Sequence, residues 1–510
     1  MDKIAVLDFG SQYSNLICRR IREINVYCEL LPYNTSALEL KKIQPKGIIF
    51  SGGPSSVYFA EAPKPDDDIF QLGIPILGIC YGHQLLIDHF GGKVRKTSIR
   101  EYGRAELTID NNSDLFSEIQ RKIKCWMSHG DAAEEVPHGF KILGHTENSI
   151  SAAIGNQERR LYGIQFHPEV VHTEKGGQIL KNFCEKISSA RPMWNMENFI
   201  ESTVQEIRTR VGNEKVLCAL SGGIDSTTVA ALLNKAVNKN LKCVFVNHGL
   251  LRQNEEASIA GLLKDYLQTE LILVNAETQF LRELKGVSDP EMKRKIIGEE
   301  FAKVFVQVAE NNGPFQWLAQ GTLYPDVIES GLSKGPASAI KTHHNVGGLP
   351  KWLGLKTIEP LRELYKDEVR RVATLLGVPK EILGRHPFPG PGLAVRIIGE
   401  VTAEKILIAR NASRIVEDEL RAAGLYDKVW QAYASVGDDK AVGVLGDASI
   451  LGYIVIVRIV ESTDAMTADW VKVPFEVLGK MSTRITNEVE GVSWVTYAIS
   501  SKPPATIEPQ

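Results

Sequence analysis

A single cysteine lies between two glycines at residues 78–82, in the string Gly-Ile-Cys-Tyr-Gly. The apolar run 74–79 predicts a buried strand, and the residues from 83 onward predict the start of a helix. The flanking glycines permit the sharp turn of a nucleophile elbow, and a helix N-terminus favours the thiolate form of cysteine. A lone buried cysteine usually only packs, but this arrangement predicts that Cys80 is a nucleophile.

A cysteine nucleophile requires a base, a group that orients the base, and donors for the tetrahedral oxyanion. His167 and Glu169 lie two residues apart at the end of an extended stretch. We therefore expect His167 to move the proton and Glu169 to hold the imidazole. The backbone N–H groups of Gly53, in the turn 51–54, and of Tyr81 are candidates for the oxyanion donors.

A second glycine-rich turn joins the apolar run 216–220 to another helix start. Its residues are Ser221, Gly222, Gly223, Ile224, Asp225, Ser226 and Thr227. Backbone N–H groups freed by glycines, hydroxyl groups and a helix N-terminus together form a cradle for anions. The chain contains no GxxxxGK[ST] string, so this loop is not a Walker loop. We expect it to bind phosphates.

These two segments resemble two known families. Residues 1 to about 188, with a GxCxGHQ elbow and an intact His-Pro-Glu string, resemble the class I glutamine amidotransferases. That resemblance implies a γ-glutamyl thioester on Cys80, release of ammonia, and a glutamine site that includes a Ser-His-Gly-Asp turn. The implied glutamine-binding residues are Gln84, Ser128, His129 and Gly130.

The SGGIDS string resembles the PP-loop of the N-type ATP pyrophosphatases. This resemblance implies that AMP is transferred from ATP to an acceptor and that pyrophosphate leaves. It also implies Mg²⁺, bound with ATP and close to Asp225, and no organic prosthetic group. Residues 286–298 combine an Asp-Pro turn with Lys293 and two further basic residues. We interpret them as a mobile lid over the phosphates, with a solvated run of charges as the alternative.

Three strings further along the chain favour one acceptor. They are QGTLYPDVIES at 320–330, KTHHNVGGLP at 341–350 and KPPATIE at 502–508. With them the whole chain resembles the GMP synthetases, which implies XMP as the acceptor and a homodimer built by the C-terminal domain. The implied XMP-binding residues are Asp326, Glu329, Lys341, Thr342, His343, His344, Asn345, Gln431, Lys502, Thr506, Ile507 and Glu508. Two features depart from the family pattern: Trp494 replaces a common arginine, and the tail ends in Pro509 and Gln510.

Two other functions are compatible with parts of the sequence. One is a glutamine-dependent ligase for another acceptor, such as an NAD-synthetase-like enzyme, although its glutaminase would normally be of the nitrilase type. The other is a regulatory binding protein with inactive sites. The intact Cys80, His167 and Glu169 argue against the second.

The elements that position these residues follow a βαβ rhythm. Short apolar runs at 4–7, 47–50, 74–79, 216–220 and 243–246 alternate with amphipathic, helix-like stretches, as in parallel α/β sheets. The candidate chemistry then lies at the carboxyl ends of strands, where open sheets bind ligands. We predict two open parallel-sheet α/β domains, at 1–188 and 192–385, and a small α+β dimerisation domain at 386–510, with the second boundary inside the Pro/Gly-rich stretch 384–392.

Composition predicts a soluble, cytoplasmic protein. The 510 residues suggest about three folding units. A formal net charge of −3 with interspersed signs argues against nucleic acid as a partner. No window approaches the ~18 apolar residues of a membrane span, so we expect no membrane association. The seven scattered cysteines show no zinc-binding spacing and suit a reducing compartment.

Overall fold

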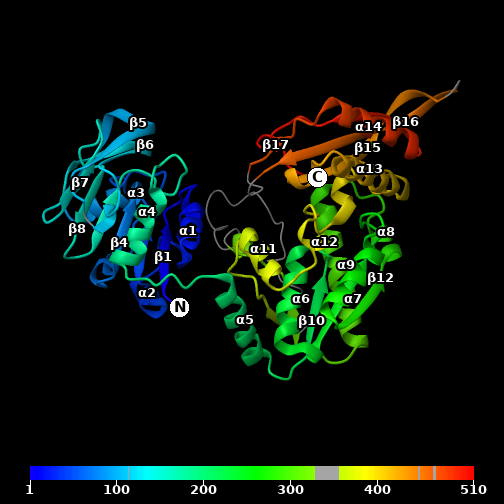
Figure 1. The fold of residues 1–510 in the computed structure, drawn as a ribbon, viewed down its shortest axis with the longest axis horizontal. Coiled ribbons are helices and arrows are strands. Elements are labelled where there is room, and N and C mark those ends of the chain that lie inside the picture. Colours follow the sequence, from blue (N-terminus) through cyan, green and yellow to red (C-terminus); the bar gives the residue numbers. More distant parts are fainter. Residues whose placement is uncertain (113, 328–354, 446–447, 463–466) are drawn as a thin grey trace. The chain divides into compact units, whose positions relative to one another are not determined.

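The structure is a computed structural model that describes residues 1–510 except 113, 328–354, 446–447 and 463–466 (Figure 1). The chain divides into two compact units, Met1–Phe199 and Ile200–Gln510. The division lies a few residues into helix α5 (Met196–Val211), close to the boundary expected near residue 190. The boundary expected at 385/386 falls inside the second unit.

The first unit is built on a nine-stranded sheet in the order β2-β1-β3-β4-β9-β8-β7-β5-β6. Its parallel half contains β1 (Lys3–Asp8), β2 (Tyr27–Pro32), β3 (Gly47–Phe50), β4 (Ile76–Ile79) and β9 (Leu161–Ile164). Every residue of β3, β4 and β9 is buried, as expected for parallel strands covered on both faces. The helices of this unit are α1 (Ser14–Glu23), α2 (Ala37–Ile43), α3 (Tyr81–His89) and α4 (Gly176–Lys181), which continues as a π-helical turn at Asn182–Ile187.

An antiparallel half extends this sheet beyond β9. It consists of β8 (Ala153–Asn156), β7 (Lys141–His145), β5 (Lys93–Ile109) and β6 (Lys122–Glu135). The βαβ rhythm did not predict these strands. They bring residues 128–131, within β6, into the same sheet as the parallel strands that carry the cysteine.

The second unit begins with a parallel five-stranded sheet in the order β12-β11-β10-β13-β14. Its strands are β10 (Val216–Leu220), β11 (Leu241–Asn247), β12 (Glu270–Asn275), β13 (Trp317–Ala319) and β14 (Lys356–Ile358). The helices around it are α6 (Ile224–Val237), α7 (Glu255–Leu267), α8 (Glu277–Glu283), α9 (Pro290–Asn311), α11 (Lys366–Leu375) and α12 (Lys380–Leu383). Because the strand order reverses at β10, the loop that follows β10 lies at a topological switch point, where such sheets bind ligands.

The C-terminal part of this unit has the expected α+β character (Figure 1, orange to red). Strand β16 (Ala448–Glu461) pairs antiparallel with β15 (Gln431–Leu445) and β17 (Asp469–Trp470), and parallel with β18 (Val492–Tyr497). Helix α13 (Ala403–Ala422) packs against β15, and α14 (Phe475–Glu488) packs against α13 and β18. One hydrophobic core includes Leu217 and Val244 of the five-stranded sheet and Ala434 and Val455 of this part, so the second unit is continuous.

Candidate active sites

The predicted elbow is present between β4 and α3. Cys80 adopts φ 53° and ψ −101°, a strained conformation often found at functional sites. A Cβ atom at Gly82 would lie 2.5 Å from the carbonyl oxygen of Phe50, and one at Gly78 would lie 2.7 Å from the backbone nitrogen of His83. Both flanking positions therefore require glycine. The Cys80 N–H donates to the carbonyl of Ile164 at 2.8 Å, which fastens the elbow to β9.

His167 and Glu169 lie beside the cysteine, as predicted. His167 Nδ1 is 2.7 Å from Glu169 Oε1, and both side chains are buried. Burial alone would lower the pKa of His167, but the charge of Glu169 and hydrogen bonds with Cys80 and Glu169 raise it to about 11. The imidazole is therefore charged at neutral pH, next to the Cys80 side chain. The ring of Tyr13 packs edge-on against His167, with 5.2 Å between centroids.

The turn at 51–54 borders this pair. A Cβ atom at Gly52 would lie 3.2 Å from His167 Cε1 and 3.7 Å from Cys80 Cβ. A Cβ atom at Gly53 would lie 3.3 Å from the ring of Tyr81. The residues predicted to donate to the oxyanion are thus close neighbours, and their role remains a prediction.

The residues predicted to hold glutamine also gather here. Gln84 Nε2 donates to the carbonyl of Asp131 at 3.0 Å, and the carbonyl oxygen of Ser128 lies 3.7 Å from Cys80 Sγ. His129 is buried, with Nδ1 2.8 Å from the same Asp131 carbonyl. The expectation of a turn at 128–131 was wrong, because these residues, Gly130 included, lie within strand β6.

Sequence reasoning missed one side chain at the nucleophile. Gln165 is fully buried, and its Nε2 lies 3.7 Å from Cys80 Sγ. Its Oε1 accepts a hydrogen bond from Gln84 Nε2 at 3.2 Å. The signal available in the sequence was its position two residues before His167, because alternate residues of an extended stretch face the same side.

In the second unit, the loop 221–227 forms a compact turn between β10 and α6. The Ser221 N–H donates to Ser226 Oγ at 3.1 Å, and the two hydroxyl oxygens are 3.0 Å apart. Gly222 has φ +71°, and a Cβ atom there would lie 2.5 Å from a methyl carbon of Ile259. The Thr227 hydroxyl donates to the Gly223 carbonyl at 2.8 Å, within the first turn of α6.

Asp225 has a cationic partner that its own motif does not contain. Lys366 Nζ, at the start of α11, lies 2.7 Å from Asp225 Oδ1. A Cβ atom at Gly321 would lie 3.6 Å from Asp225 Cβ, so the segment after β13 also borders the loop. Lys366 lies 141 residues from Asp225, and nothing local in the sequence pointed to it.

The C-terminal tail is held against the last sheet. Glu508 Oε2 lies 3.2 Å from Arg396 Nε, and Glu508 also pairs with Gln431 Nε2. Arg396 is 1% exposed, and its guanidinium group lies 4.3 Å from the ring centroid of Tyr433. The Tyr433 hydroxyl donates to the Ile507 carbonyl at 2.6 Å. Gln431, Ile507 and Glu508, predicted as parts of one site, are therefore neighbours.

Two further residues of the tail are fixed through the backbone. Arg458 Nη2 donates to the Thr506 carbonyl at 3.2 Å. Lys502 exchanges backbone hydrogen bonds with Ala468, of which the Lys502 N–H bond is 2.7 Å long. Trp494, the departure from the family pattern, donates from Nε1 to the Val442 carbonyl at 3.1 Å.

Residues 286–298, predicted to form a mobile lid over the phosphates, lie around the start of helix α9 in this structure. Asp289 caps helix α9, and the basic residues lie in its first turns. Lys293 is 0% exposed, and its Nζ lies 2.7 Å from the Ile397 carbonyl and also contacts Gln510 Oε1. Burial, together with the charge of Lys405, lowers the pKa of Lys293 to about 8. In this conformation Lys293 packs against the C-terminal part of the chain.

Most of the predicted XMP site between β13 and β14 lies outside the described residues. These residues are Glu329, Lys341, Thr342, His343, His344 and Asn345. Asp326 is described, and its Oδ2 accepts a hydrogen bond from the Leu323 N–H at 2.9 Å.

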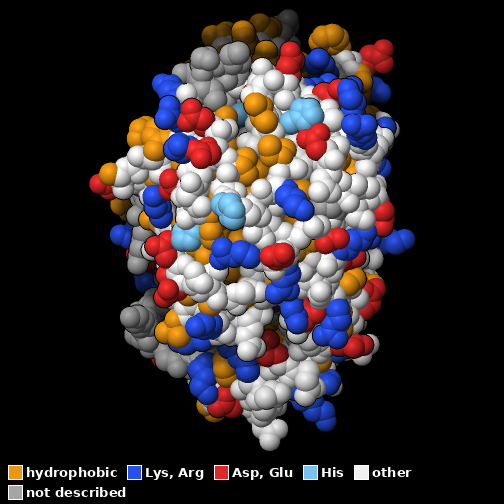
Figure 2. All heavy atoms as spheres, turned by 90° about the vertical axis from the view of Figure 1, so that its left-hand side faces the viewer, with side chains coloured by type: hydrophobic (Ala, Val, Ile, Leu, Met, Phe, Trp, Pro, Cys, Tyr) orange, Lys and Arg blue, Asp and Glu red, His pale blue; other side chains and the backbone are white. Residues whose placement is uncertain are grey.

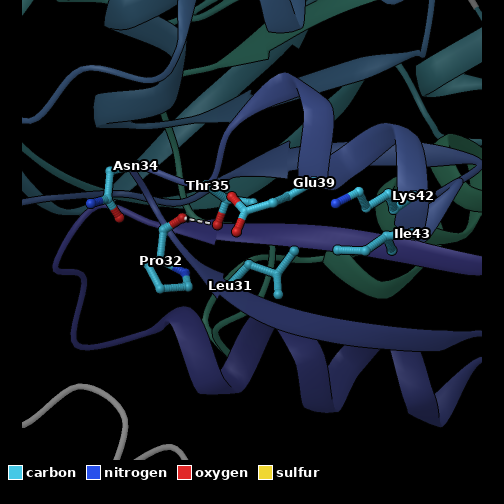
Figure 3. Close-up of a pocket in the computed structure, with 7 residues that line it drawn as sticks. All are labelled: Leu31, Pro32, Asn34, Thr35, Glu39, Lys42 and Ile43. Atoms are coloured by element: carbon cyan, nitrogen blue, oxygen red, sulfur yellow. Dashed lines mark hydrogen bonds between the residues drawn. The ribbon is translucent and has the colours of Figure 1, made fainter.

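A cavity of about 590 Å³ lies at the edge of the first sheet (Figure 3). It is lined by Leu31, Pro32, Asn34, Thr35, Glu39, Lys42 and Ile43. None of the predicted site residues lies in it. On the face drawn in Figure 2, basic and acidic side chains are interspersed.

Comparison with known families places this geometry in context. Residues 5–187 match the family Glutamine amidotransferase class-I, residues 200–289 match Asparagine synthase, and residues 418–509 match GMP synthase C terminal domain. A protein of Caldanaerobacter subterraneus subsp. tengcongensis named GMP synthase [glutamine-hydrolyzing] is 54% identical over 507 residues, which cover 99% of each chain. This chain belongs to the glutamine-hydrolysing GMP synthase family.

Other GMP synthases match along the same length. Those of Carboxydothermus hydrogenoformans and Alkaliphilus metalliredigens are 53% and 52% identical, each over 99% of this chain and 99% of their own. The resemblance seen in the motifs is thus confirmed for the whole chain. Among the described residues, no helix has the length and apolar character needed to cross a lipid bilayer.

Proposed function

We propose that this member of the GMP synthase family converts XMP, ATP and glutamine into GMP, AMP, pyrophosphate and glutamate. The observation that carries the proposal is the presence of both reaction centres in one chain: the buried His167–Glu169 pair at the Cys80 elbow, and the anion cradle at 221–227. Full-length relatives bearing that name support the choice of reaction.

Cys80 begins the glutaminase half-reaction. Its thiolate attacks the side-chain carboxamide of glutamine, and the N–H groups of Gly53 and Tyr81 stabilise the oxyanion. The imidazolium of His167, held by Glu169, gives its proton to the leaving nitrogen, so ammonia departs and a γ-glutamyl thioester remains. His167 then takes a proton from water, which attacks the thioester carbon; glutamate leaves and the thiolate is restored.

The loop 221–227 holds the phosphates of ATP in the synthetase half-reaction. The two serine hydroxyls and the N-terminus of α6 supply donors. Among the described residues, no three His, Cys, Asp or Glu side chains gather into a metal site. Mg²⁺ commonly uses one or two protein carboxylates and substrate phosphates. Asp225, whose carboxylate pairs with Lys366, would hold it. Bound there, Mg²⁺ would neutralise charge on the phosphates.

The tail and the segment after β13 supply the acceptor site in this proposal. Gln431, Lys502 and Glu508 are its described polar members, and residues 506–508 are held by buried side chains of the last sheet. A carbonyl oxygen of XMP attacks the α-phosphorus of ATP, and pyrophosphate leaves. Ammonia then displaces AMP from the adenylated carbon, which gives GMP.

A product assay tests this function. The chain is incubated with glutamine, ATP, Mg²⁺ and either XMP or deamido-NAD, and the nucleotides are separated by chromatography. We expect GMP, AMP and pyrophosphate in equal amounts with XMP, and no product with deamido-NAD. Formation of ADP, or amidation of deamido-NAD, would contradict the proposal.

We also propose that the chain forms a homodimer through its last sheet. Val444 is 78% and Trp494 53% exposed, and the exposed Val442 and Leu451 are direct cross-strand partners. Such a grouped apolar face is typical of an interface. In sedimentation, Leu451→Glu should yield monomers, while Phe475→Ser, at an exposed position on α14, should stay dimeric. A monomeric parent protein at micromolar concentration would refute the proposal.

A cytoplasmic location is the last part of this proposal. All seven cysteines are free and buried, with no disulfide among them, which suits a reducing compartment. Fractionation of cells that express the protein, with the chain detected by antibody, tests this.

A further inference from the structure

A buried carboxylate lies behind the glutaminase site and has no role in the chemistry described above. Glu101, on β5, is the direct cross-strand partner of His129, on β6. Both side chains are buried, and His129 Nε2 lies 3.3 Å from Glu101 Oε2. The Thr146 hydroxyl donates to Glu101 Oε1 at 3.0 Å. A carboxylate is rarely buried without partners of this kind.

An unbroken chain of contacts connects this carboxylate to the nucleophile. His129 Nδ1 lies 2.8 Å from the Asp131 carbonyl, which also accepts from Gln84 Nε2 at 3.0 Å. Gln84 Nε2 donates in addition to Gln165 Oε1, and Gln165 Nε2 contacts Cys80 Sγ. The Asp131 carbonyl is thus contacted by His129 on one side and by Gln84 on the other, and these two contacts fix the backbone at 128–131.

The chemistry of the ring nitrogens determines what Glu101 does. A carbonyl oxygen only accepts hydrogen bonds, so Nδ1 of His129 carries a proton. Nε2 lies 3.3 Å from Glu101 Oε2 without hydrogen-bonding geometry, and because a carboxylate also only accepts, it attracts this nitrogen when the ring carries its second proton. Glu101 thus holds the His129 ring in the one orientation that directs Nδ1–H at the Asp131 carbonyl.

We infer that Glu101 is a positioning residue of the glutaminase site. Through His129 it sets the backbone of residues 128–131, whose Ser128 carbonyl borders Cys80 Sγ at 3.7 Å. That carbonyl is an acceptor that N–H groups of the substrate can meet. Glu101 therefore supports substrate binding and not the reactivity of the thiol, which depends on His167 and Glu169. The inference rests on the proposed glutamine hydrolysis.

Kinetics of Glu101→Ala in the full-length protein test this role. We expect the KM for glutamine to rise tenfold or more. The rate at which iodoacetamide alkylates Cys80, and synthesis from ammonium salts, should stay within twofold of the parent. Glu101→Gln should keep KM within threefold, because its amide can donate to Nε2 and accept from Thr146. The control is Glu106→Ala, which removes an exposed pair with Lys122 between the same two strands and should change nothing.

Each outcome decides the matter. An active parent protein with an unchanged KM in Glu101→Ala would overturn this inference alone. If the alkylation rate of Cys80 and the turnover of glutamine fall together in Glu101→Ala, the inference is also overturned. Such a result would show that Glu101 maintains the structure of the whole site and not only substrate binding. If Glu101→Ala does not fold, Thr146→Val serves instead, because it removes the hydroxyl that donates to the Glu101 carboxylate. We expect it to raise the KM for glutamine twofold to fivefold, and an unchanged KM would overturn the inference. A parent protein without glutaminase activity would overturn the proposed function itself.

Discussion

The charge of Glu169 gives the sharpest prediction for the glutaminase site. Glu169→Gln keeps the size of the side chain but removes the carboxylate that lies 2.7 Å from His167 Nδ1. A charge-assisted hydrogen bond contributes about 1.5–3 kcal/mol, or about ten- to hundredfold in rate. In Ser-His-Asp triads, loss of the same charge lowers kcat by about 10⁴. Because Glu169 is fully buried, we expect kcat for glutamine to fall by about 10² to 10⁴.

The pH dependence of this variant follows from the same contact. Glu169 raises the pKa of His167 to about 11, against the effect of burial. Without it the imidazolium should lose its proton at a much lower pH, so the deficit of the variant should grow as pH rises above 6.5. The raised pKa also means that His167 stabilises the folded state fully below pH 6.5 and loses this contribution as pH rises toward 11. Glu169→Gln should flatten that part of the stability curve.

Two assays check this prediction. Glutaminase rates between pH 6 and 10 give the deficit, and chemical denaturation at the same pH values gives the free energy of unfolding. Synthesis from ammonium salts should survive, because it does not use Cys80. The matched control is Glu174→Gln, an exposed carboxylate that accepts from the Lys124 N–H. A deficit below tenfold that does not change with pH would refute the role assigned to Glu169.

Four further predictions concern the glutaminase elbow, the phosphate loop and the C-terminal tail. Cys80→Ala should abolish glutamine-dependent synthesis and leave synthesis from ammonium salts largely intact; loss of both in a steady-state assay would mean that Cys80 is structural. Asp225→Ala should stop release of pyrophosphate with either nitrogen source while glutaminase activity remains measurable, and normal pyrophosphate release would disprove its role. Lys502→Ala should weaken XMP about ten- to hundredfold, the loss of a charge-assisted contact of about 1.5–3 kcal/mol, with ATP affinity nearly constant in titration calorimetry; an XMP affinity within twofold of the parent would speak against the site. Gly82→Ala should lower the melting temperature and the glutaminase rate because its Cβ would meet the Phe50 carbonyl, whereas Gly177→Ala, which meets nothing within 4 Å, should do neither.

The features found from the sequence are those encoded in short strings. Local conformational preference is enough to predict a turn followed by a helix at Gly78 and Gly82 and at the loop 221–227. The structure has a turn and a helix start at each place. The pattern of the charge run at 293–295 does not show that Gln510, at the end of the chain, contacts Lys293. Glu101 and Lys366 were missed because their partners lie on other strands or loops. Neither local segment contains a pattern that indicates which distant residue it will contact.

The hydrogen bond from the Cys80 N–H to the Ile164 carbonyl has a consequence for how the enzyme matures on the ribosome. Strand β4 is complete at residue 79, but its neighbour β9 is synthesised some 80 residues later, followed at once by His167 and Glu169. Chains emerge at about 5–20 residues per second, so each nascent chain carries an elbow without its supporting strand for several seconds. During that interval the thiol lacks His167 and Glu169, because both residues follow β9 in the chain. A nascent or truncated chain that ends before β9 therefore cannot release ammonia.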